Sequence, residues 1–156
     1  MFNRYEVSPF EGTYQFVTKN DIQYVCTFAD ITENFDELDT KNCRILMFNL
    51  TNKSIGTLPP LDSRVGVTVT WILSEFFKGN DDVIIYVADT KDGRHEKRRQ
   101  RFDRWLRDYP IAGVVIDNYI YQNLLAGIIR KETELHKLIS DELRMRFDIM
   151  KEGYSN

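Results

Sequence analysis

The first part of the chain alternates between apolar and polar residues with a period of two. Tyr14 and Phe16 in one run, and then Tyr24, Cys26 and Phe28 in the next, place apolar side chains on one face and polar side chains on the other. This alternation is typical of half-buried strands. The two runs are separated by three residues that tolerate tight turns, so the sequence predicts an antiparallel hairpin.

The rest of the chain switches between strand and helix patterns. Short apolar runs predict further strands at 44–51, 83–88, 114–121 and 124–130. Apolar residues spaced three or four apart predict helices at 62–78, 94–109 and 133–150. The polar stretch 32–43 has little periodicity, so we interpret it as a solvated connection.

The segment 62–78 fits two patterns. Its valines alternate as in a strand, but Val65 and Val69 also fall on one face of a helix. Asp62 is a suitable N-cap, Gly79 is a suitable stop, and the segment is longer than an average strand. These features favour a helix.

This order of elements predicts an α+β fold. We expect a mostly antiparallel sheet with an N-terminal β-meander, one crossover unit and three packing helices. No repeat, low-complexity segment or flexible linker divides the chain, so residues 1–156 are interpreted as a single domain.

Composition and charge narrow the class of protein. The chain has 156 residues, of which 42% are apolar and 29% charged, as in an ordinary globular domain. No apolar run is long enough for a membrane helix, and the N-terminus lacks the apolar core of a signal peptide. The net charge is −3, which gives no general attraction to nucleic acid. We therefore expect a cytoplasmic protein without membrane contact.

Cysteine, histidine and the common catalytic motifs offer little chemistry. Cys26 and Cys43 have no metal-binding spacing and are expected to be reduced, buried packing residues. His95 and His136 are the only histidines and lie far apart in sequence, so a metal site is not expected. His136 is predicted at an exposed helical position. The chain contains no phosphate-binding glycine motif, nucleophile elbow or zinc-protease motif.

A charged segment follows the apolar strand predicted at 83–88. Asp89, Asp92 and Arg94 lie just beyond the carboxyl end of that strand, where ligands often bind in sheets that contain a crossover. A turn with a helix cap explains the same residues, because aspartate and glycine are common turn formers. The sequence leaves open whether this cluster forms internal ion pairs or holds an anionic ligand.

The helix that follows is strongly basic. Its seven basic residues are Arg94, Lys97, Arg98, Arg99, Arg101, Arg104 and Arg107. Lys97, Arg101 and Arg104 are predicted to face solvent, opposite the apolar stripe, and they give a weak prediction of nucleic-acid contact. Arg98 falls on the side of the stripe, so we expect it beside Asp89 or Asp92.

Two resemblances accompany these patterns. Asp62-x-Arg64, Asp89-x-x-Asp92-Gly93-Arg94 and Arg98-x-x-x-Phe102-x-x-Trp105 resemble a family of small uncharacterised bacterial proteins over residues 5–110, which implies a bacterial, cytoplasmic origin and no established activity. The element order over 44–131 is similar to the second half of the GNAT acyltransferase fold. In that fold, the helix after the first of these strands opens with a loop whose amides hold the pyrophosphate of acyl-coenzyme A.

The sequence therefore supports two hypotheses of function. The leading one is a binding or regulatory module without catalysis and without a cofactor, which uses the charged segment 89–107 for a protein partner or a small anionic ligand. Its candidate binding residues are Asp62, Arg64, Asp89, Asp92, Arg94 and Arg98. The alternative is a divergent GNAT-like N-acyltransferase that depends on acyl-coenzyme A.

Overall fold

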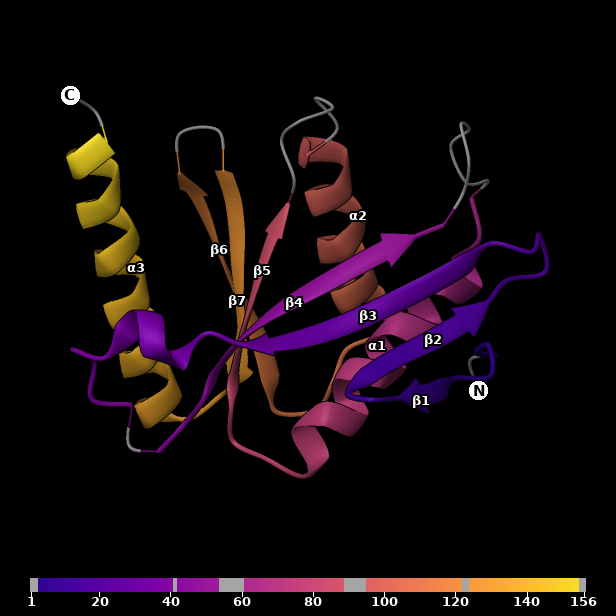
Figure 1. Ribbon diagram of the computed structural model, residues 1–156, viewed down its shortest axis with the longest axis horizontal. Helices are drawn as coiled ribbons and strands as arrows, with labels where there is room; N and C mark the ends of the chain where they lie inside the picture. Colours follow the sequence, from indigo (N-terminus) through magenta and orange to yellow (C-terminus); the bar gives the residue numbers. More distant parts are fainter. Residues whose placement is uncertain (1–2, 41, 54–60, 89–94, 122–123, 155–156) are drawn as a thin grey trace.

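The computed structural model describes residues 3–40, 42–53, 61–88, 95–121 and 124–154 (Figure 1). The strands are β1 (Ser8–Phe10), β2 (Thr13–Val17), β3 (Gln23–Asp30), β4 (Ile45–Asn52), β5 (Val83–Ala88), β6 (Val114–Tyr121) and β7 (Leu124–Lys131). The helices are the 3₁₀ helix η1 (Thr32–Phe35) and the α-helices α1 (Ser63–Lys78), α2 (His95–Asp108) and α3 (Glu134–Tyr154).

All the described strands belong to one seven-stranded sheet with the order β1-β2-β3-β4-β5-β7-β6. Strands β4 and β5 are parallel and are connected through α1, whereas the other described neighbours are antiparallel. The predicted α+β class, the N-terminal meander and the single crossover unit are confirmed.

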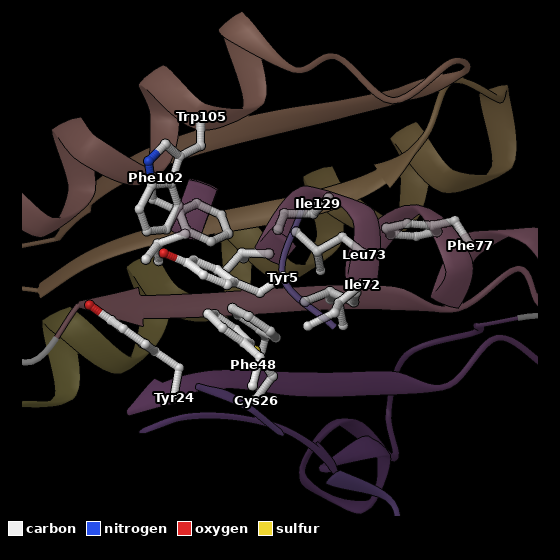
Figure 2. Packing of buried hydrophobic residues seen from close by; sticks show 14 residues of the cluster. Tyr5, Tyr24, Cys26, Phe48, Ile72, Leu73, Phe77, Phe102, Trp105 and Ile129 are labelled. Carbon is white, nitrogen blue, oxygen red and sulfur yellow. The ribbon is translucent and has the colours of Figure 1, made fainter. Parts of the chain in front are cut away.

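The helices cover both faces of the sheet. Helices α1 and α2 share one core with the aromatic residues of the N-terminal strands, while η1 and α3 pack on the other face. Successive side chains of strand β5 point to opposite faces of the sheet, because Ile84 belongs to the first core and Ile85 to the second. Figure 2 shows the first core, in which Phe102 and Trp105 of α2 lie above Phe48 and Tyr24 of the sheet. None of the described helices combines the length and apolar character needed to cross a bilayer.

The helix predicted at 62–78 forms as α1. Its N-cap is Asp62, whose side chain accepts a hydrogen bond from the amide of Arg64 at 3.0 Å, and its C-cap is Gly79. The helical spacing buries Ile72 together with Val65 and Val69, whereas a strand would direct Ile72 to the face opposite the two valines.

Two short elements were not predicted. Strand β1 has only three residues, all of them exposed, and is too short to show an alternating pattern. The stretch predicted as a solvated connection contains η1, whose Phe35 is buried against the second core, so that prediction is wrong at this position. One buried aromatic in a polar run gives no periodic signal.

Strands β4 and β5 pair over only four positions. The parallel register joins Ile45–Phe48 to Val83–Tyr86, although β4 continues to Asn52 and β5 to Ala88. Beyond this register β4 stays paired with β3 and β5 with β7, and Figure 1 shows the two strands diverging with α2 behind them.

Candidate functional site

Most of the candidate binding residues that follow β5 lie outside the residues that the structure describes. Asp89, Asp92 and Arg94 are not among the described residues, so the predicted pairing of Arg98 with Asp89 or Asp92 is untested. Arg98 itself is half-buried on α2.

Asp62 and Arg64, the other two predicted binding residues, hold the N-terminal segment against α1. Asp62 accepts a hydrogen bond from the hydroxyl of Tyr5, and the Arg64 guanidinium lies 3.9 Å from the centre of the Tyr5 ring. The Tyr5 amide donates to the hydroxyl of Thr68 at 2.9 Å. Burial and the bond to Asp62 raise the pKa of Tyr5. Both charged residues therefore have structural partners inside the chain.

Next to this contact lies a cavity of about 220 Å³, between the first turn of α1, the start of β3 and the second half of α2. It is lined by Tyr24, Leu61, Asp62, Ser63, Val65, Arg101, Arg104, Trp105, Asp108 and Tyr109. Its walls thus combine aromatic rings with charged groups of both signs. Its volume is below the range of about 300–1,000 Å³ that is usual for sites of drug-sized ligands.

The charges in this cavity are not equally matched. One oxygen of Asp62 accepts from the Arg64 amide and the other from Tyr5, and Asp108 has Arg107 at 3.9 Å. Within the described part of the chain, Arg101 and Arg104 form no ion pair with a carboxylate.

Arg101 lies closer to the core than predicted. It is half-buried, and its guanidinium sits 4.8 Å from the centre of the Trp105 ring, whereas Lys97 and Arg104 are exposed as predicted. The prediction that Arg101 faces solvent is therefore wrong in part. A helical wheel places this residue opposite the apolar stripe, but its long side chain folds back over the indole.

The charge of Arg101 affects the pKa of two tyrosines, the buried Tyr24 and the half-buried Tyr86. Burial raises the pKa of Tyr24 and of Tyr86, and in both cases Arg101 opposes that effect. Tyr86 also stacks on Phe102, with 4.2 Å between the ring centres. The guanidinium therefore acts on the aromatic core as well as on the cavity.

Gly66 fixes the position of the indole that lines the cavity. A β-carbon on Gly66 would lie 2.3 Å from Cδ1 and 2.4 Å from Nε1 of Trp105. The absence of a side chain on α1 therefore allows α2 to pack directly against it.

A buried cysteine and histidine meet on the opposite face of the sheet. His136 is 4% exposed, so its predicted exposure is wrong, and its Nε2 lies 2.7 Å from the carbonyl oxygen of Asp81. Because a carbonyl only accepts, Nε2 donates this hydrogen bond, and Nδ1 is hydrogen-bonded to the hydroxyl of Thr133. The Cys43 sulfur is 3.8 Å from Nε2.

This pair is a packing feature. Both imidazole nitrogens are occupied, and burial, reinforced by the carboxylates of Asp81 and Asp82, raises the pKa of the Cys43 thiol. A thiol in this environment is a poor nucleophile. The expectation that both cysteines are buried is confirmed, and the described residues contain no cluster of three or more potential metal ligands.

Comparison with known proteins identifies a family without an assigned activity. The model of a family described as "Family of unknown function (DUF6169)" matches residues 61–151, which is more than half of the chain and includes α1, α2 and most of α3. No curated protein and no solved structure matches the chain significantly.

Proposed function

Because the chain belongs to this family of unknown function, its role has to be inferred from its own residues, and we propose that it is a non-catalytic binding module for a small anionic ligand. The ligand occupies the cavity between α1 and α2, and Arg101 and Arg104 bind its anionic group.

One observation carries this proposal. In a cavity lined by two acids and two arginines, the acids have partners within the chain, whereas the arginines have no carboxylate partner among the described residues. The charge that remains for a ligand to neutralise is therefore positive. Guanidinium groups match carboxylate and phosphate geometry, and such charge-assisted bonds are the stronger class of hydrogen bond.

The walls of the cavity favour a ligand with a flat apolar part. Trp105, Tyr24 and Tyr109 offer ring surfaces, and the small volume suits a compact molecule or a single side chain of a partner. Stacking on Trp105 holds Arg101 in place before a ligand arrives, which reduces the entropic cost of binding.

The alternative proposal is an N-acyltransferase that binds acyl-coenzyme A at the first turn of α1. The order of elements supports it, but two contacts weigh against it. The Asp62 carboxylate already occupies the Arg64 amide, and the backbone carbonyl of Asp62 accepts from the Val65 amide at 3.1 Å. Gly66 lies against Trp105 and is not open to a phosphate. A carboxylate at a helix N-terminus competes with an anion for the same amides.

Calorimetric titration with simple probes tests the leading proposal. Benzoate and phenyl phosphate supply a ring and an anion, while benzamide keeps the shape of benzoate without the charge. We expect the wild-type protein to bind the two anions and not benzamide. Loss of one charged hydrogen bond costs about 1.5–3 kcal/mol, so Arg101→Gln and Arg104→Gln should each weaken binding about 10- to 100-fold.

Lys97→Gln is the matched control, because Lys97 lies on the same helix, is exposed and does not line the cavity. Binding that is unchanged in Arg101→Gln and Arg104→Gln, or equal affinity for benzamide and benzoate, refutes the anion site. Acyl-coenzyme A is titrated in parallel and assayed with a primary amine. Acyl transfer to the amine would favour the alternative.

A further inference from the structure

Strand β6 ends the sheet, and half of its backbone groups point away from the molecule. The amide of Glu132 donates to the carbonyl of Gly113 at 2.9 Å, so the opposed pair formed by these two residues is hydrogen-bonded. Bonded and non-bonded pairs alternate in an antiparallel ladder, so Val115 and Asp117 bond to β7, while Ile116 and Asn118 direct their amides and carbonyls outward. No described strand pairs with this outer side.

This edge lacks the protection found at the other end of the sheet. Strand β1 has only three residues and contains Pro9, both of which discourage pairing with a further strand. Strand β6 has eight residues with neither proline nor lysine. Its one charged residue, Asp117, forms an ion pair with Arg130, whose Nε lies 2.6 Å from the carboxylate. A long edge strand with a single charged residue is a template for another strand.

We infer that β6 pairs antiparallel with β6 of a second copy of this chain, about a two-fold axis at Asn118. With the axis there, the outward groups of Asn118 bond to Asn118 of the second copy, and residues 115–121 overlap in full. Moving the axis to Asp117 gives a similar overlap, but it places Asp117 opposite the same residue of the second copy, and like charges in that position are destabilising. Moving it to Tyr119 shortens the overlap to residues 117–121. A self-complementary strand suits a symmetric partner, because one patch serves both copies.

Apolar surface beside β6 extends the contact beyond the backbone. A groove of about 300 Å³ lies between α2 and the sheet edge. Its lining consists of Leu106, Ile111, Val114, Val115, Ile116 and Ile129, together with the charged residues Asp103 and Arg107. The Asn118 side chain lies on the same face, because its oxygen is 3.3 Å from the point where a β-carbon on Gly127 would lie, a point that Ile116 also approaches. Side chains of a strand added at this edge cover the groove, and burial of that apolar surface adds to the ladder of hydrogen bonds.

Sedimentation equilibrium of the full chain tests this inference. The wild-type protein is expected to form a concentration-dependent dimer. Asn118→Pro removes an outward amide and leaves the β6–β7 ladder intact, while Asn118→Lys places two like charges against each other across the axis. Both variants should weaken dimerisation at least tenfold, with unchanged circular dichroism and unchanged binding of benzoate.

Asn49→Lys is the matched control, because Asn49 is exposed on β4, inside the sheet, and the substitution changes the charge equally. This variant should dimerise like the wild-type protein. A monomeric wild-type protein, or dimerisation that both Asn118 variants leave unchanged, overturns the inference. Neither result bears on the cavity, so the two proposals are tested separately.

Discussion

The contact between Gly66 and Trp105 allows a sharp test of how packing supports the cavity. Gly66→Ala adds one carbon to α1 at a point where three atoms of the indole already lie within 2.7 Å. Trp105 is 7% exposed, so most of the ring is closely packed and its open side is the cavity that it lines. The clash must be relieved by displacing Trp105 and the part of α2 that carries it.

Two opposing contributions determine how much Gly66→Ala changes the free energy of unfolding. Alanine is favoured over glycine inside a helix by about 1 kcal/mol, which would stabilise α1. Overpacking a well-filled core costs about 1–3 kcal/mol, and a contact of 2.3 Å belongs at the upper end of that range. We therefore expect Gly66→Ala to lower the free energy of unfolding by about 1–2 kcal/mol.

Urea denaturation, followed by circular dichroism, measures this difference. Gly79→Ala is the control on the same helix, because its added carbon would meet nothing within 4 Å and its φ of −106° suits alanine. The control should stay within about 0.5 kcal/mol of wild type. Trp105 lines the cavity, and the Arg101 guanidinium stacks on its ring, so Gly66→Ala should also weaken benzoate binding. Equal or higher stability of Gly66→Ala would refute this account of the packing.

Two further predictions concern groups outside the cavity. Burial alone would raise the pKa of Asp117, but hydrogen bonds from Arg130 and Ser140 lower it overall. The ionised carboxylate therefore stabilises the fold at pH values above its unfolded pKa. This stabilisation is lost as the pH falls through the folded pKa. The difference in unfolding free energy between wild type and Arg130→Met should therefore be largest near neutral pH and shrink below about pH 4, and a difference that grows on acidification would contradict the pairing. Burial raises the pKa of Cys26 to about 12 and also raises the pKa of Cys43, so neither thiol should react with a disulfide reagent at neutral pH until the protein unfolds, and rapid labelling of the native protein would show that they are accessible.

The strands and helices with a repeating apolar pattern were predictable because local spacing and burial agree in them. Strand β5 is a continuous apolar run with residues from both cores, and α1 has a cap, a stop and a buried face at helical spacing. The same patterns predicted one crossover unit, and α1 supplies it, because the parallel strands β4 and β5 need a crossover between them.

The misjudged positions depend on contacts that are distant in sequence. His136 stands beside charged and polar residues on α3, and only the arrival of Cys43 and the Asp81 carbonyl makes it a core residue. A usable signal was nevertheless present, since His136 shares helical spacing with the buried Ile139, Ser140 and Leu143. The cavity has no comparable signal, because it combines β3, α1 and α2.

The charged residues show how far a sequence pattern reaches toward the candidate site, because the predicted binding residue Asp62 does line the cavity but its contacts could not be foreseen. Asp62 and Arg64 were predicted to bind a ligand, but their capping and stacking contacts with Tyr5 already use their charges within the fold. Arg101 and Arg104 were predicted as a solvated basic face, yet they line the cavity without a carboxylate partner among the described residues. A guanidinium that has a partner contributes mainly to stability, whereas one held beside a cavity without a partner leaves its charge for a ligand. That difference depends on which groups meet in space, which is why we place the proposed anion site on α2 and a structural role at the first turn of α1.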